Sequence, residues 1–530
     1  MTVSDPASGQ PAESRAPWSS LWPWLLAFAL LAILYLQHAP NVLNTPVYTG
    51  NDGWVFNSDF VQVSRGVPLY SGVWEDKDPL YFYAYSIFER IFGVTGPMIC
   101  ETLISLATIA VLLAIARRLR LPAIVAAACT GICVLYLFSP NTYWPLNTYH
   151  LALLLFFISL LLAQYRRLAL AGAFFAAAVF AKMTMAAFAP AALAIPLVAV
   201  APDWSSVWHR FRAWFVGAAA LTAMAVLTLL VRGELSGYIG VIQLNLSYSS
   251  LEQATMGVVN HPFHDFEVTV GTLCACVMVG LTVVLSVILL IRLVRQLRTV
   301  REPTNGAVER ALTGVMASAV FAGAAGALIL HIASWFVDYF QCLGPLFFLL
   351  PLSFALLLGR IDLGFGRRFR GITLRGPVVS VAGVIALGVV MTASGFVTPA
   401  ALAGPPQQVS LAFVNVNAID PAVSDCIDKY PFASRATTFA SIGTNQFAVE
   451  CLVPPNMHLV CPLIDQFPSY GNALLEQFKS CLGSRPEIVF SEPLLYFTGY
   501  KTTLMAILNE HFAMIGSCGP EEIWQRKPSG

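Results

Sequence analysis

The chain has 530 residues, of which 57% are hydrophobic and only 11% are charged, and its net charge is +1. A soluble domain carries about a quarter of its residues as Asp, Glu, Lys or Arg, so this composition excludes an ordinary soluble protein. The near-zero net charge gives no support to nucleic-acid binding.

The N-terminal segment, residues 1–20, is polar and contains a single Arg. It lacks the basic start and the small-residue cleavage site of a secretory signal. We therefore expect a disordered cytoplasmic tail that leads into a first membrane span.

Apolar blocks of about twenty residues follow, which is the length that an α-helix needs to cross the hydrocarbon core of a bilayer. Eleven blocks are candidate spans. They fall at about 21–38, 97–115, 122–139, 149–164, 168–182, 186–201, 213–231, 269–291, 311–332, 343–359 and 377–396.

Arginines occur in every second connection between these blocks. They are Arg117, Arg118 and Arg120; Arg166 and Arg167; Arg210 and Arg212; Arg292, Arg295, Arg298 and Arg301; and Arg360, Arg367, Arg368, Arg370 and Arg375. Because basic loops stay on the cytoplasmic side, the N-terminus is predicted inside and the C-terminus outside. The prediction is a multi-pass protein of the plasma or inner membrane, with a transmembrane domain over 21–398 and a large first outer loop over 39–96.

The tail, residues 399–530, has a different composition. Short apolar runs, such as 437–443, 457–464 and 487–491, read as strands that alternate with helical segments, which predicts an extracytoplasmic α/β domain with a parallel core. Five of the eleven cysteines lie here: Cys426, Cys451, Cys461, Cys481 and Cys518. An oxidising compartment permits disulfides among them, but the sequence does not give the pairing.

The first outer loop is much longer than a connector needs to be, which indicates a function of its own. Residues 51–78 contain five acids and two bases, with many aromatic residues in and after this stretch. Tyr81, Phe82, Tyr85 and Phe88 recur at helical spacing after Pro79 and predict an amphipathic helix at the membrane interface.

Several motifs resemble the GT-C superfamily, the multi-spanning glycosyltransferases related to aminoarabinose, mannosyl and arabinosyl transferases (the glycosyltransferase family 39-like group). In the first outer loop these are Asp52, the turn Gly66–Tyr70 and the run Trp74–Pro79, which opens a helix. Ala181–Thr184 resembles the lysine motif at the outer end of a span, and Tyr339–Phe340 resembles the entry to a late span. The strands at 485–489 and 524–527 resemble the outer domain appended to many members.

The chain departs from the family pattern at Asp338, where members often carry His or Arg. The nearest basic side chain is His331, about two helical turns earlier. No phosphate-binding role is therefore assigned to position 338.

The resemblance implies an all-α polytopic GT-C fold with about 11 transmembrane helices. It also implies an inverting hexosyl- or pentosyltransferase that uses a polyprenyl-phosphate sugar donor and a glycan or glycolipid acceptor of the cell envelope, with membrane lipid as a further partner. Metal dependence stays open, since some relatives use a divalent cation and others do not, and no metal ligands are assigned.

Sugar transfer from a lipid phosphate requires a base for the acceptor hydroxyl and positive charge for the departing phosphate. The catalytic candidates are Asp52, as general base, and Asp59, as a second acid. The candidates for binding the donor phosphate are Lys77, Arg65 and Lys182, and the candidates for binding substrate are Glu75, Tyr70, His150 and Tyr339.

Each assignment has a simpler alternative. In these alternatives, Asp52 only caps a helix beginning at Gly53, Lys77 is only a surface charge in an acidic run, and Lys182 only extends to the lipid headgroups. The cluster at 260–265 contains two His and one Asp, a set that binds divalent metals in some proteins and none in most. At the level of function, the alternatives are a transporter or flippase for lipid-linked intermediates and a non-catalytic assembly protein.

Overall fold

The computed structural model describes two parts of the chain, a helical part near the N-terminus and a sheet near the C-terminus. The described residues are 21–45, 51–70, 75, 77–118, 121–137, 146–188, 204–243, 436–442, 458–461, 476, 478–483, 486–491, 501–518 and 521–528. The predicted spans from 269–291 onward, most of the span at 186–201, and the cluster at 260–265 lie outside these residues.

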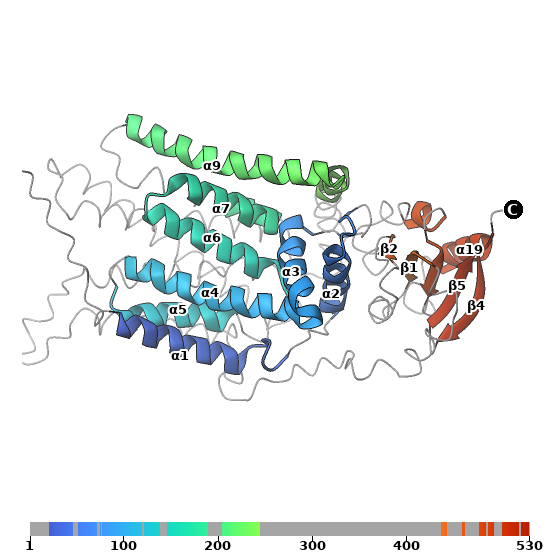
Figure 1. Cartoon of the computed structure of the whole chain (residues 1–530), viewed down its shortest axis with the longest axis horizontal. Helices are drawn as coiled ribbons and strands as arrows, with labels where there is room; N and C mark the ends of the chain where they lie inside the picture. The colour runs from blue at the N-terminus through green and yellow to red at the C-terminus, as the bar shows by residue number, and fades with distance from the viewer. Residues whose placement is uncertain are drawn as a thin grey trace, which may run out of the picture.

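The helical part consists of a bundle of helices with two further ones across one end (Figure 1). The helices of the bundle are α1 (Trp22–His38), α4 (Gly96–Arg118), α5 (Ala123–Leu137), α6 (Thr148–Gln164), α7 (Leu168–Ala181) and α9 (Trp204–Val231). Each coincides with a predicted span. The two crossing helices are α2 (Asn51–Ser64) and α3 (Pro79–Phe92), both from the first outer loop.

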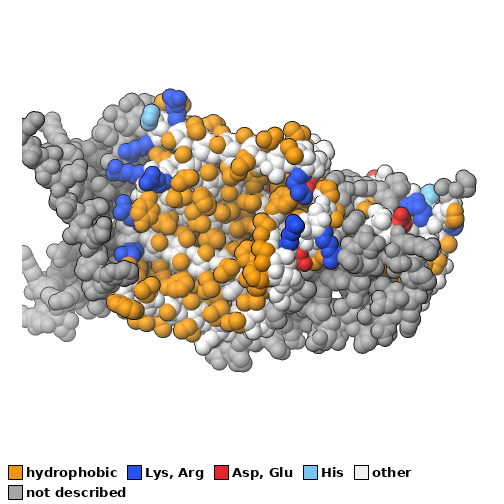
Figure 2. Space-filling model, viewed as in Figure 1, with side chains coloured by type: hydrophobic (Ala, Val, Ile, Leu, Met, Phe, Trp, Pro, Cys, Tyr) orange, Lys and Arg blue, Asp and Glu red, His pale blue; other side chains and the backbone are white. Residues whose placement is uncertain are grey.

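Two of the described helices, over Gly96–Arg118 and Trp208–Val231, are long and apolar enough to cross a membrane. The apolar helices Trp22–Gln37, Ala123–Val134, Thr148–Gln164 and Leu168–Ala181 are shorter. Figure 2 shows hydrophobic side chains along the bundle and Lys and Arg gathered at its two ends. The prediction of a mostly helical membrane protein is therefore confirmed, while the number of spans remains a prediction.

Helices α7 and α9 pack closely because each presents a glycine to the other. A Cβ added at Gly172 would lie 1.9 Å from the Trp214 carbonyl oxygen, and one added at Gly217 would lie 1.7 Å from the Ala169 carbonyl oxygen. Small residues of this kind let helix backbones approach each other in membranes, where the hydrophobic effect does not drive association.

Local signals place the ends of α3. Pro79 stands in the first turn, where its missing N–H costs nothing, and Asp78 before it is extended. Gly93, at φ +66, ends the helix in a conformation that L side chains rarely adopt. The predicted helix after Pro79 is therefore present.

The aromatic stripe of α3 faces protein and not lipid. Tyr81, Phe82 and Tyr85 are fully buried, and their rings pack against Phe56 and Phe60 of α2. The exposed apolar side chains on this helix are instead Ile87, Ile91 and Phe92. The stripe thus fixes α3 to α2, while the opposite face is available to lipid.

The C-terminal part contains a five-stranded sheet with the order β2-β1-β3-β5-β4. Its strands are β1 (Thr438–Ile442), β2 (His458–Leu459), β3 (Ile488–Ser491), β4 (Phe512–Cys518) and β5 (Glu521–Arg526), and α19 (Lys501–His511) precedes β4. Strands β2, β1 and β3 are parallel, whereas β5 is antiparallel to both β3 and β4. A disulfide joins Cys461 to Cys481, a pairing that the sequence did not give.

Candidate functional site

Polar residues gather where the loop over 39–96 meets the C-terminal end of α7. Asp78, which precedes α3, accepts a hydrogen bond at Oδ2 from the backbone N–H of Met183 at 2.8 Å. Met183 opens the short 3-10 helix η3 (Met183–Phe188), directly after α7. Lys77 directly precedes Asp78 and Lys182 directly precedes Met183, so this hydrogen bond brings the main chains that carry the two lysines close together.

Lys182 is held against the first turn of α6. Its Nζ lies 4.9 Å from the centroid of the Tyr149 ring, and the Tyr149 hydroxyl accepts a hydrogen bond from Thr184 Oγ1 at 3.1 Å. Asn147 caps α6 by accepting a bond from the Tyr149 N–H at 2.9 Å, so the ring is fixed by the helix that carries it. The ammonium group thus has a defined position on this side of the bundle.

The Lys77 peptide is bonded on both sides. Its N–H donates to Glu75 Oε1 at 3.0 Å, and its carbonyl oxygen accepts from the Tyr70 hydroxyl at 2.7 Å. Burial and then the charge of Asp78 raise the pKa of Tyr70 well above its usual range, so that hydroxyl remains a donor. The substrate candidates Tyr70 and Glu75 therefore hold the main chain at Lys77.

Asp52 and Asp59 both lie in α2, seven residues apart and hence on one face of the helix. Because α2 begins at Asn51, Asp52 does not cap a helix starting at Gly53. Its side chain lies outside what the structure describes. Asp59 is fully buried, so an acceptor does not reach its carboxylate from solvent.

Arg65 lies at a different place from the two lysines. It lines a cleft of about 480 Å³ together with Glu89, Arg90 and Gly93, at the C-terminal ends of α2 and α3. Lys77 precedes the N-terminus of α3, and fourteen residues of helix correspond to about 20 Å. This placement argues against a phosphate site shared by Arg65 and Lys77.

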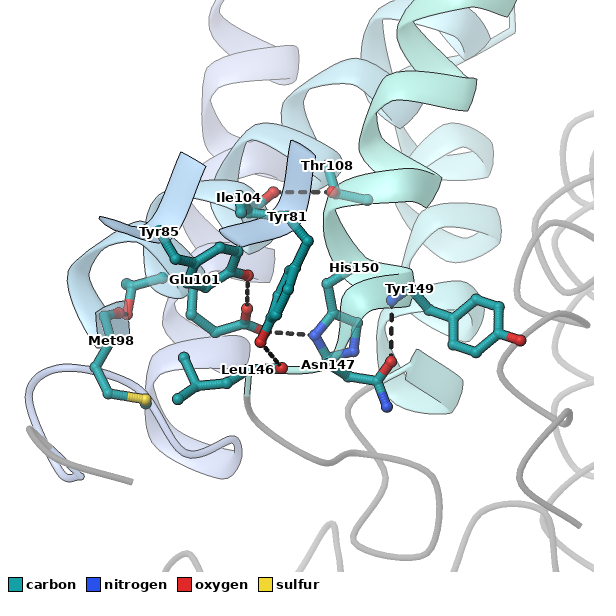
Figure 3. Close-up of polar contacts among 11 residues, drawn as sticks. Tyr81, Tyr85, Met98, Glu101, Ile104, Thr108, Leu146, Asn147, Tyr149 and His150 are labelled. Atoms are coloured by element: carbon teal, nitrogen blue, oxygen red, sulfur yellow. Dashed lines mark hydrogen bonds and ion pairs between the residues drawn. The ribbon is translucent and has the colours of Figure 1, made fainter. Parts of the chain in front are cut away.

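His150 is buried in the helix core and does not line a cleft. Its Nδ1 contacts Glu101 Oε1, and Glu101 Oε2 accepts from the Tyr85 hydroxyl. In Figure 3, His150 and Tyr85 point toward Glu101 from α6 and α3, while Tyr149 points away. Glu101 was not singled out in the sequence, although a single acid in an otherwise apolar helix is a signal for a polar partner inside the bundle.

Two further residues, Glu234 and Tyr238, were not singled out in the sequence. Glu234 is fully buried and accepts from Leu69 N at 3.0 Å, and the Tyr238 hydroxyl donates to Asp78 Oδ1 at 2.8 Å. Their partners lie far away in the sequence, so no local pattern marked them. The predicted substrate residue Tyr339 lies outside the described part of the chain.

The site offers two lysines and several carboxylates but no evident metal centre. Among the described residues, no group of three or more His, Cys, Asp or Glu is arranged to hold a metal ion. At this site, Lys77 and Lys182 offer positive charge to an anionic ligand.

A mostly helical membrane protein with a basic site at one end of its bundle is the class that these observations define. Residues 76–230 match the model of the dolichyl-phosphate-mannose-protein mannosyltransferase family, a GT-C-type family, and this stretch runs from Asp76 to one residue before the end of α9. The resemblance predicted from the sequence is confirmed for this part of the chain. No curated protein matches the sequence.

Solved structures with a similar course are all distant in sequence. The apo oligosaccharyltransferase of Archaeoglobus fulgidus is 12% identical, with 97% of this chain and 75% of that chain covered and a TM-score of 0.47. The same organism's AglB in complex with an inhibitory peptide and a dolichol-phosphate is 12% identical, with 96% and 75% covered and a TM-score of 0.44. ArnT from Cupriavidus metallidurans is 13% identical, with 95% and 98% covered and a TM-score of 0.40. These TM-scores are too low for the likenesses to decide fold or function.

Proposed function

We propose that the chain is a membrane glycosyltransferase that moves a sugar from a polyprenyl-phosphate carrier to an envelope glycan or glycolipid, with inversion at the anomeric carbon. The observation that carries the proposal is the hydrogen bond from Met183 N to Asp78, which brings the segment that carries Lys77 next to the segment that carries Lys182. The family matched by residues 76–230 is named for a dolichyl-phosphate sugar donor, which is the same class of ligand.

The two lysines serve the departing phosphate. Positive charge fixed in advance stabilises negative charge that develops in the transition state, and removing one such group typically costs about a hundredfold to a thousandfold in rate. The Lys77 main chain is bonded on both sides and the Lys182 ammonium lies over the Tyr149 ring, so both lysines are held by the protein before the donor binds.

Asp52 is the base in this proposal. Attack by the acceptor hydroxyl on the anomeric carbon breaks the bond to the phosphate oxygen, and the proton goes to the carboxylate. Asp59 follows two helical turns later and is fully buried, which suits a positioning role better than proton transfer.

The proposed site faces the non-cytoplasmic side of the plasma or inner membrane. Arg117 and Arg118 end α4, and Arg166 and Arg167 connect α6 to α7, so the basic connections lie at the far end of these helices from Lys182. The disulfide in the C-terminal part suits an oxidising compartment, which supports an extracytoplasmic location for residues 399–530.

The test is transfer of radiolabelled sugar from a panel of polyprenyl-phosphate sugars by membranes that contain the wild type, Asp52→Asn or Lys77→Ala. We expect one donor to be consumed by the wild type and at least about a hundredfold less transfer by each variant at equal expression. Arg117→Ala, which removes a charge at the opposite end of the bundle, is the matched control and should retain activity.

Two outcomes contradict the proposal. If both variants keep wild-type transfer, the site is wrong. If the wild type transfers from no donor while a labelled carrier crosses the membrane, transport replaces transfer as the function.

A further inference from the structure

The segment after α9, residues 232–243, is tied to the first outer loop by two buried carboxylates. Glu234 accepts from Leu69 N at 3.0 Å and from Arg232 Nε at 2.8 Å, and its second oxygen accepts from the Tyr83 hydroxyl. In the other direction, the Tyr238 hydroxyl donates to Asp78 at 2.8 Å. Each segment thus supplies one carboxylate to the other.

The tyrosine donors in these ties remain protonated. Burial, followed by the charge of Asp78, raises the pKa of Tyr238, and burial, followed by the hydrogen bond to Glu234, raises the pKa of Tyr83. Buried carboxylates need such donors, because an unmet acceptor in a dry environment is costly. In both ties the carboxylate is therefore matched by donors, and the bonds hold the first outer loop in a fixed position against residues 232–243.

Between these two ties, residues 237 and 238 pack against Tyr70, whose hydroxyl bonds the Lys77 carbonyl. The Tyr70 and Tyr238 rings stack with their centroids 5.6 Å apart. Gly237 meets Tyr70 so closely that a Cβ added there would lie 2.5 Å from the Tyr70 Cβ. Any side chain at 237 must displace Tyr70, whose own backbone is at φ +67.

We propose that Glu234, Gly237 and Tyr238 are positioning residues that hold Lys77 in place for the phosphate of the lipid-linked donor. They touch neither the donor nor the reacting atoms. They act through Leu69, Tyr70 and Asp78: the Tyr70 hydroxyl bonds the Lys77 carbonyl, Leu69 precedes Tyr70, and Asp78 follows Lys77. The inference rests on the proposed function, because it gives residues 232–243, here called the brace, a role in donor binding.

Two glycines three residues apart in the same helical segment give a matched pair for the test. Gly237→Ala collides with Tyr70, whereas Gly240 has nothing within 4 Å of an added Cβ. We expect Gly237→Ala to lower kcat/KM for the polyprenyl-phosphate sugar by about tenfold to a hundredfold, the cost of a misplaced group near the reaction. The KM for the acceptor should stay unchanged, and Gly240→Ala should behave as the wild type.

Tyr238→Phe and Glu234→Gln separate the two ties. Tyr238→Phe keeps the ring stack and removes the bond to Asp78, so its donor kcat/KM should fall less than that of Gly237→Ala. Glu234→Gln keeps the shape and one acceptor oxygen, and it should retain more donor kcat/KM than Glu234→Ala. A merely structural role predicts equal losses for donor and acceptor and no rescue by Gln.

Amide hydrogen exchange of the purified full chain provides a readout that does not depend on transfer. The Leu69 amide donates to Glu234, so Glu234→Ala should speed its exchange by about tenfold or more. Gly237→Ala displaces Tyr70 and so releases the Lys77 carbonyl. It should therefore also speed exchange at the Lys77 amide, which donates to Glu75, by about tenfold or more. Gly240→Ala should change neither amide.

Unchanged exchange in Gly237→Ala and Glu234→Ala overturns the brace, as does a Gly237→Ala enzyme with wild-type donor kcat/KM. If the wild type transfers no sugar, the proposed function fails, and the exchange data by themselves decide whether residues 232–243 hold Lys77.

Discussion

Asp78 and Glu101 are both buried carboxylates that accept a tyrosine hydroxyl, yet their surroundings differ. Asp78 accepts from Tyr238 and from the Met183 backbone, so its partners belong to the segments that carry Lys182 and follow α9. Glu101 binds Tyr85 of α3 and His150 of α6 inside the bundle (Figure 3). The comparison indicates that Asp78 orders a site, while Glu101 fastens three helices together.

The largest expected effect is on stability at Glu101. Glu101→Ala leaves Tyr85 and His150 buried without their acceptor, and we expect a loss of about 3 kcal/mol in the free energy of unfolding. Thermal unfolding in detergent measures it, and Leu103→Ala, a half-exposed position on the same helix, is the control. A Glu101→Ala protein as stable as the control but without transfer would move Glu101 into the site and break the comparison.

Lys182 and Arg118 form the same contact at opposite ends of α6. Each charged group lies 4.9 Å from a ring centroid, Lys182 over Tyr149 and Arg118 over Tyr165. Lys182→Ala should reduce transfer about a hundredfold with little change in unfolding temperature, because Lys182 stands beside the proposed phosphate site and Arg118 does not. Arg118→Ala should keep full transfer, and equal losses in both variants would show that the contact is structural.

Removing one hydroxyl from each network sharpens the comparison. Tyr85→Phe should lower the free energy of unfolding by about 1–2 kcal/mol and leave the donor KM unchanged. Tyr238→Phe should raise the donor KM as well. Paired unfolding and kinetic measurements check this, and a raised donor KM in Tyr85→Phe contradicts the division of roles.

The smallest expected effect is that of pH. Burial and the charge of Asp78 raise the pKa values of Tyr70 and Tyr238 above the unfolded value of about 10. The neutral hydroxyls therefore contribute stability that is fully present below about pH 10 and lost as the pH rises through the raised pKa values. Amide exchange at Lys77, corrected for its intrinsic pH dependence, should stay constant from about pH 7 to pH 9. Faster corrected exchange within that range would show that the tyrosines ionise early.

The sequence by itself determined the helices of the bundle, helix α3 and which of their connections are basic. Apolar period, span length, Pro79 and the alternating arginines are local signals, and they predicted α1, α3 to α7 and α9. The runs predicted as strands likewise contain β1, β2 and β3. Local motifs also singled out Lys77 and Lys182, whose neighbours Asp78 and Met183 are hydrogen-bonded to each other.

Only the tertiary structure decided which of these residues meet. Glu234 bonds Leu69 across 165 positions in the sequence, and Tyr238 bonds Asp78 across 160. The same packing puts Arg65 at the other end of α3 from Lys77 and turns the aromatic stripe toward α2. Such contacts depend on how separate helices pack against one another, and packing leaves no periodic signal in either segment alone. The lysines could therefore be predicted from the sequence, whereas the contacts of residues 232–243 with the loop that carries Lys77 could not.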